Sequence, residues 1–139
     1  MESASFIEIK LTELENAVEE AWENSKVPFL FDQTGNASTF FHYKERLVEC
    51  YKGVVQVAMG AADVASVVDS WRANFVSSMR YGDTCVFHMD KTAPDFLTQY
   101  NSDMFPVPKI FCKELISREE FYMKMLKPEE NVNRFGDKG

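Results

Sequence analysis

Apolar residues follow two alternating spacings in the first half of this chain, and each spacing predicts one kind of element. A stretch with helical spacing begins near Thr12, which stands three residues before Glu15 as in a capping box. Its apolar face consists of Leu14, Ala17, Val18, Ala21 and Trp22. The pattern predicts a first helix that ends at residues 24–26.

A continuous apolar run follows at residues 27–31, with a proline near its start. Such runs are typical of strands buried on both faces of a parallel sheet. Residues 32–35 then form a polar turn with one glycine, after which Asn36 or Ser38 can cap a helix. We therefore expect a strand at 27–31 and a second helix that continues to Gly53.

The same alternation continues to residue 90. Valines within residues 54–57 predict a second strand. Asp63 can cap a long third helix, and Gly82 stands where a left-handed C-cap residue is expected. Residues 84–89 predict a third strand. Because parallel strands need crossover helices, this order predicts a three-layer α/β/α sandwich with a mostly parallel sheet.

The second half of the chain is less regular. We expect a short helix at 94–100, a rigid extended stretch at 105–108 and a fourth strand at Ile110 and Phe111. Another capping-box spacing, that of Ser117 and Glu120, predicts a last helix. The chain then divides into a single α/β domain over residues 1–128 and a flexible C-terminal tail over residues 129–139.

Composition restricts the classes of partner. The 139 residues carry a formal net charge of -7, which argues against nucleic acid or an anionic membrane as the main partner. No apolar run reaches the roughly 18 residues that a transmembrane helix needs. The acidic N-terminus lacks an apolar signal core, so we expect a cytoplasmic protein.

The three cysteines, Cys50, Cys85 and Cys112, match no zinc-binding spacing. We expect them to be reduced, buried thiols, with a thiol oxidoreductase as a further alternative. The two histidines, His42 and His88, stand in no motif typical of a catalytic triad. The sequence therefore predicts no catalytic residue, no metal ligand and no cofactor.

Two aspartates directly follow predicted strands, Asp32 and Asp90. In a parallel sheet both would lie at the carboxyl edge, where ligands bind. A nucleotide or phosphometabolite site there would use Asp32, Thr34, Gly35, Asn36 and Asp90. The loop has no lysine and is too short for a P-loop. The alternative is a structural turn in which Asp32 bonds the backbone and Gly35 supplies a positive φ.

Part of this pattern resembles a known family. Residues 28–37 are similar to a proline–apolar–Asp–x–x–Gly–x–Ala segment in the fifth AAA module of dynein heavy chains, and the matching residues are Pro28, Asp32, Gly35 and Ala37. The helix, valine-rich strand and long helix that follow occur in the same order. Residues 79–87 resemble the family's segment that leads into its Walker B strand.

The resemblance covers roughly residues 26–100 and implies a P-loop-NTPase-like (AAA-like) core. Residues 32–38 would be a degenerate phosphate loop (Walker A), and Met89 and Asp90 would end Walker B. In that family the module is regarded as structural rather than catalytic. This chain, in addition, has no Lys–Ser/Thr pair in the loop. The resemblance therefore implies a domain without ATP hydrolysis.

Our leading hypothesis is a non-catalytic, AAA-like interaction or scaffold module with a protein partner. The resemblance links it to dynein or cytoskeletal assemblies, with a cytoskeletal or axonemal location. Residues 32–36 and the aromatic, proline-rich residues 96–108 are the candidate contact surfaces. The alternative hypothesis is a protein that binds a nucleotide or phosphometabolite through Asp32–Gly35 and Asp90.

Overall fold

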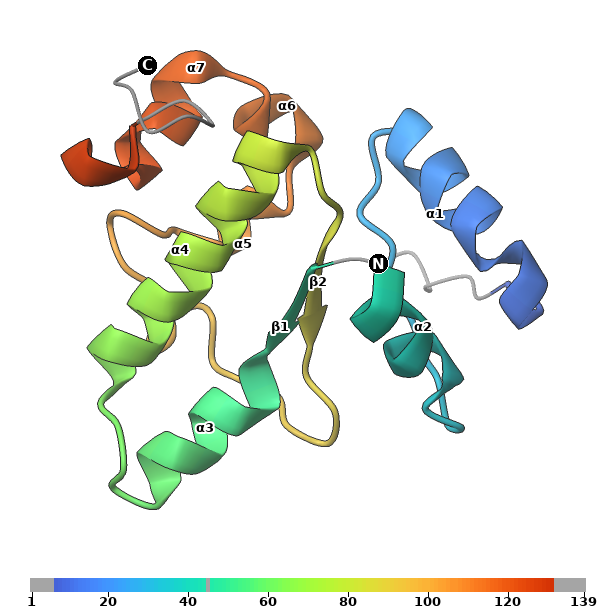
Figure 1. Cartoon of the computed structure of the whole chain (residues 1–139), viewed down its shortest axis with the longest axis horizontal. Coiled ribbons are helices and arrows are strands. Elements are labelled where there is room, and N and C mark those ends of the chain that lie inside the picture. Colours follow the sequence, from blue (N-terminus) through green and yellow to red (C-terminus); the bar gives the residue numbers. More distant parts are fainter. Residues whose placement is uncertain (1–6, 45, 132–139) are drawn as a thin grey trace.

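The computed structural model describes residues 7–44 and 46–131 (Figure 1). Four helices have nine residues or more: α1 (Leu14–Glu23), α2 (Asn36–Lys44), α3 (Cys50–Ala58) and α4 (Val64–Tyr81). Three are single turns: α5 (Val107–Ile110), α6 (Lys113–Ile116) and α7 (Glu119–Tyr122). Short 3-10 helices are η1 (Leu11–Glu13), η2 (Met123–Met125) and η3 (Pro128–Glu130).

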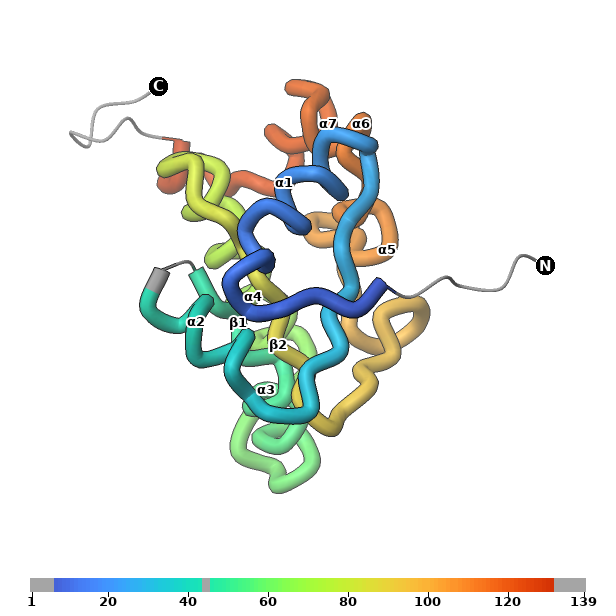
Figure 2. Tube along the Cα trace, turned by 90° about the vertical axis from the view of Figure 1, so that its right-hand side faces the viewer, coloured from blue at the N-terminus to red at the C-terminus, as the bar shows by residue number. Residues whose placement is uncertain are grey.

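The sheet has two parallel strands, β1 (Arg46–Glu49) and β2 (Cys85–His88). Helix α4 lies on one side of it, while α1, α2 and the segment between them lie on the other side (Figures 1 and 2). The prediction of a three-layer α/β/α sandwich with a mostly parallel sheet is therefore wrong. The described chain is mostly helical, and two strands do not make the sheet of an AAA-like, P-loop-type core.

The main error concerns residues 46–58. The sequence placed 46–53 in a helix and 54–57 in a strand, whereas the structure has strand β1 followed directly by helix α3. Val54 and Val57 stand three residues apart, and both pack against the core from one face of α3. A Cβ at Gly53 would lie 2.6 Å from Val67 Cγ1, so this glycine lets α3 approach α4 closely.

The strand predicted at residues 27–31 is also absent. These residues form no regular element in the structure, and Phe29 and Phe31 are 69% and 77% exposed. A continuous apolar run predicts burial only if other elements cover both of its faces. Among the described residues β2 pairs with β1, and the run is not part of this sheet.

The long helix and the following strand are confirmed. Asp63 caps α4 by accepting a hydrogen bond from the Ser66 N–H at 2.7 Å, and Gly82 ends it with a φ of 70°. β2 lies within the strand predicted at 84–89. The first helix is confirmed as α1, but Thr12 lies in η1, and Glu13 makes no side-chain cap.

Four predictions in the second half are wrong. Residues 96–99 are turns rather than helix, and α5 takes the place of the fourth strand at Ile110. Arg118 rather than Ser117 precedes α7, so the second capping box does not form. The extended stretch expected at 105–108 is interrupted, because α5 begins at Val107, and Phe105 is fully buried in the core.

The core forms around one face of α4. Its buried residues are Val67, Val68, Trp71, Phe75 and Val76. They pack with residues from β1, α3 and the C-terminal half, namely Val48, Cys50, Tyr100, Phe105, Val107, Ile110 and Met125. The indole of Trp71 stacks on the ring of Tyr100 at 5.5 Å between centroids, which fixes the turn-rich segment against α4.

Arg72 is the one charged residue in this buried set of the described chain, and it is 1% exposed. Its Nε donates to Asp69 Oδ1 at 2.9 Å, and its Nη1 donates to the Met125 carbonyl at 2.8 Å and to Glu130 Oε1 at 2.7 Å. Glu130 also accepts from the Lys127 N–H at 2.7 Å. These bonds attach η3 to α4, so the segment that closes the described chain is held by a buried cation.

Within the predicted tail, residues 129–131 thus belong to the described part, and residues 132–139 lie outside it. The pKa of Glu130 is lowered from its ordinary value. Desolvation by burial opposes this shift, but the hydrogen bonds from Arg72 and Lys127 outweigh it. The folded state therefore stabilises the ionised form of the Glu130 carboxylate.

Replacing Glu130 with Gln should destabilise the fold by about 1–3 kcal/mol at pH 7, because it weakens charge-assisted bonds to a buried guanidinium. A lowered folded-state pKa contributes stability above the unfolded pKa of about 4.3 and loses it as pH falls through the folded value. Urea unfolding across this pH range should therefore show a smaller acid loss for Glu130→Gln than for the parent chain. Glu129→Gln is the control, and an equal effect from it would contradict the role of Glu130.

Candidate functional sites

The loop before α2 is organised by Asp32. Its Oδ1 accepts hydrogen bonds from the Thr34 N–H at 3.0 Å and the Thr34 hydroxyl at 2.7 Å, and its Oδ2 accepts from the Ala37 N–H at 2.7 Å. Slight burial raises the pKa of Asp32, but these hydrogen bonds together lower it by more, so the pKa lies below its ordinary value. Gly35 has a φ of 78°. The structural-turn alternative is therefore confirmed.

This arrangement disfavours a phosphate at the same place. The N-terminal N–H groups of a helix attract anions, but the carboxylate of Asp32 already occupies the Ala37 N–H of α2. A bound phosphate would lie beside that negative charge. Thr34 Oγ1 accepts from the Asn36 N–H at 3.3 Å, so this hydroxyl is also part of the turn.

Asp90 lies in the exposed turn after β2, where its φ is 52°. The sequence placed Asp32 and Asp90 at one edge of a sheet, each directly after a strand. Only Asp90 follows a strand in the structure, and no contact between the two carboxylates is recorded among the described residues. Of the five predicted ligand-binding residues, four therefore lie at the start of α2, namely Asp32, Thr34, Gly35 and Asn36. The fifth, Asp90, lies in a separate turn.

Other residues occupy the carboxyl ends of the two strands. Glu49 and His88 are partners in the β1–β2 register. The Tyr51 ring meets the His88 ring edge to face at 5.0 Å, and Lys52 Nζ pairs with Glu49 Oε2 at 2.7 Å. The hydrogen bond from Lys52 lowers the pKa of Glu49, and Glu49 in turn raises that of Lys52.

Of these residues, only His88 is a candidate from the sequence, and the sequence pattern does not identify Glu49, Tyr51 and Lys52 as site residues. It treated them as residues of a helix that continued through 46–53, so no strand end was expected there. A cavity of about 320 Å³ opens beside Glu49 and Lys52, between β1, α3 and α4. Its other lining residues are Leu47, Val48, Gly53, Gln56, Ala62, Ser66, Val67, Ser70, Trp71 and Asn74.

Of the three thiols expected to be buried, Cys50 is buried, whereas Cys85 and Cys112 are half-buried. Cys50 is fully buried, and burial together with the nearby Cys85 raises its pKa to about 12. Burial likewise raises the pKa of Cys85. Since the thiolate is the reactive form, neither residue is suited to redox catalysis. Among the described residues, no group of three His, Cys, Asp or Glu side chains could hold a metal ion.

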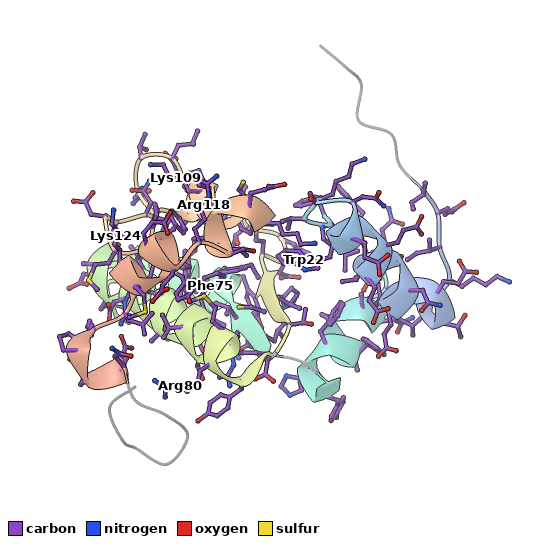
Figure 3. All side chains as sticks on the ribbon, turned by 90° about the horizontal axis from the view of Figure 1, so that it is seen from above. Trp22, Phe75, Arg80, Lys109, Arg118 and Lys124 are labelled. Atoms are coloured by element: carbon purple, nitrogen blue, oxygen red, sulfur yellow. The ribbon has the colours of Figure 1, made fainter. Side chains whose placement is uncertain are left out.

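A second hollow of about 370 Å³ lies in the C-terminal half. It is lined by Asn101, Ser102, Asp103, Pro106, Pro108, Lys109, Phe121 and Lys124. Figure 3 shows Lys109, Arg118 and Lys124 gathered on one side of this half, away from Arg80. Within the predicted contact surface 96–108, Tyr100 and Phe105 serve the core instead, and the polar residues border this hollow.

Residues 27–31, which we call the apolar segment, expose several apolar side chains on one continuous stretch. Val27, Phe29, Leu30 and Phe31 all expose more than a third of their surface. Phe29 and Phe31 meet edge to face at 5.5 Å between ring centroids. No backbone hydrogen bond joins residues 27–30 to another part of the described chain.

Comparison with protein-family models, with curated proteins and with solved structures finds no match for this chain. In the described ranges 7–44 and 46–131, no helix is long and apolar enough to cross a membrane.

Replacing Asp32 with Ala should destabilise the chain by about 1 kcal/mol, because the Ala37 N–H in the first turn of α2 loses its acceptor. Gln33→Ala, at the neighbouring exposed position, should change stability by less than about 0.5 kcal/mol. Thermal unfolding of both variants measures the difference. Equal stabilities would show that Asp32 does not cap α2.

Proposed function

We propose that this chain is a non-catalytic protein-binding module and that it binds its partner through the apolar segment. The observation that carries this proposal is the exposure of Val27, Phe29 and Leu30 on one continuous stretch. Exposed apolar side chains that adjoin one another mark interaction sites more often than scattered ones do. Burying one such Phe contributes about 1.5–3 kcal/mol.

Both ends of the apolar segment are fixed. Before it, the Lys26 N–H closes α1 on the Ala21 carbonyl at 2.8 Å. Lys113 Nζ donates to the Trp22 carbonyl at 2.8 Å and thereby attaches α1 to α6. After the segment, Asp32 caps α2. A short extended stretch held between two helices loses less conformational entropy on binding than a free peptide does.

The chemistry of the segment defines the partner. Within the described ranges no hydrogen bond is recorded for the backbone N–H and C=O groups of Phe29 and Leu30, and the side chains of the segment are apolar. A protein with an unpaired sheet edge and apolar side pockets matches both properties, as in β-strand addition. Pro28 cannot donate a hydrogen bond, so pairing would begin at Phe29.

The alternative, a nucleotide- or phosphometabolite-binding protein, is less well supported because Asp32 occupies the helix terminus that would bind a phosphate. A nucleotide at 100 times its dissociation constant would add about 2.7 kcal/mol of stability, which a thermal shift assay detects readily. A cytoplasmic location and a partner from dynein or cytoskeletal assemblies stay hypotheses that rest on the composition and the motif resemblance.

Replacing Phe29 with Ser should weaken partner binding tenfold or more, because a large exposed apolar side chain of the segment is lost. Tyr43→Ser is the matched control, since Tyr43 is also an exposed aromatic residue, 83% exposed on α2. Both variants should unfold at the temperature of the parent chain. The full chain and the two variants are used as bait in extracts of the source cells, and captured proteins are quantified by mass spectrometry.

A protein that Phe29→Ser loses and Tyr43→Ser retains is then purified and titrated against all three chains. The proposal requires the same order of affinities in that titration. Equal capture by the three baits would contradict binding through the apolar segment.

A further inference from the structure

The cavity between β1, α3 and α4 has the features of a small-molecule site. Its volume of about 320 Å³ lies at the lower end of the range for ligand pockets, about 300–1,000 Å³. Three buried side chains, Val48, Val67 and Trp71, form its apolar part. The cavity adjoins the carboxyl end of β1, and ligands of open parallel sheets bind at such strand ends.

Polar groups converge on the same space. The side chains of Gln56 and Ser70 line the cavity, and no hydrogen bond from either is recorded within the described chain. Asn74 also lines it and donates to the Ser70 carbonyl at 2.9 Å, which leaves its amide oxygen as an acceptor. A bound molecule would therefore find both donors and acceptors.

Trp71 can offer a hydrogen-bond donor to a ligand. The residue is only 3% exposed, but its indole N–H is not among the buried polar atoms that lack a partner in the described chain, so this atom stays accessible. The Nε1 atom lies 3.5 Å from the position that a Cβ on Gly53 would take, and Gly53 also lines the cavity. An indole N–H that is accessible from the cavity can donate to an acceptor atom there. An acceptor atom of a ligand at this position would satisfy it.

The charges at the cavity define the class of ligand. Lys52 and Glu49 provide one ammonium and one carboxylate, 2.7 Å apart and both partly exposed. Exposed ion pairs of this kind contribute little free energy, so a ligand can replace their mutual contact at small cost. A small zwitterion would offer a carboxylate to Lys52 and an ammonium group to Glu49.

We propose that this cavity binds a free α-amino acid, with the carboxylate at Lys52, the ammonium at Glu49 and the side chain directed toward Gln56, Ser70 and Trp71. This site is separate from the apolar segment and goes beyond the proposed protein-binding function. Neither the cavity nor its charges contribute to the exposed surface at residues 27–31.

The two tryptophans of the chain allow a direct measurement. In the full chain with Trp22→Phe, all tryptophan fluorescence comes from Trp71. Each standard L-α-amino acid is titrated separately into this protein. We expect at least one to change the fluorescence saturably and to raise the unfolding temperature, whereas acetate and ethylamine at equal concentration change neither.

Two variants in the same background test the location. Ser70→Leu fills the cavity from an exposed position of α4 and should abolish binding. Ala65→Leu, exposed on the same helix and outside the cavity, should leave binding unchanged. Lys52→Met should weaken binding about tenfold or more through loss of the carboxylate contact.

The proposal is overturned if no amino acid binds at about 10 mM, where a site with a Kd of about 1 mM is nearly saturated. It is also overturned if Ser70→Leu binds as well as Ala65→Leu, or if acetate binds as tightly as the amino acid. These results would leave protein binding at Phe29 unaffected, so the two proposals can fail separately.

Discussion

Burial of one face of α4 is the constraint on which the rest of this structure depends. A two-stranded sheet exposes both of its edges and is marginal without further packing. Here Val68, Trp71 and Phe75 bring together β1, α3 and the irregular C-terminal half. Arg72, on the same helix, adds the only buried cation of the described chain and attaches η3. Loss of this helix would leave the sheet and the C-terminal turns without a common support.

The same constraint separates the two candidate sites. Close approach of α3 to α4 at Gly53 positions the cavity beside Glu49 and Lys52, with Trp71 between the cavity and the core. The apolar segment lies on the other side of the sheet, between α1 and α2, where α4 does not reach (Figures 1 and 2). One site is therefore built by the core, and the other consists of apolar residues that the core does not bury.

Local signals predict the ends of the long helix α4 correctly, although the equally local capping-box spacing of Ser117 and Glu120 does not form a cap. Asp63 and Gly82 mark the ends of α4 without reference to the rest of the chain, and the cap is confirmed. The prediction for residues 46–58 is wrong because the valines in this range fit both a strand and a helix. Packing of α3 against Val67 of α4 favours the helix, and this contact is not visible in the local sequence. The strand expected at 27–31 fails for a related reason, since apolar character alone does not supply neighbouring strands.

The sites follow the same rule. The turn role of Asp32 and Gly35 was one of two alternatives from the sequence, because it depends on residues within a single loop. The pair of Arg72 and Glu130 spans 58 positions, and the register of Glu49 with His88 joins two separate strands. Such contacts leave no trace in local spacing, so the cavity and the buried cation were not predictable.

Native-state hydrogen exchange tests the central claim, a core on α4 with the apolar segment outside it. The amides of Val68, Trp71 and Phe75 should exchange only through global unfolding, because they lie in the buried core helix. The amides of Phe29 and Leu30 should exchange at rates close to those of an unfolded chain. Protection at Phe29 and Leu30 equal to that of β2 would show that residues 27–31 form a strand of the sheet, and it would contradict this account.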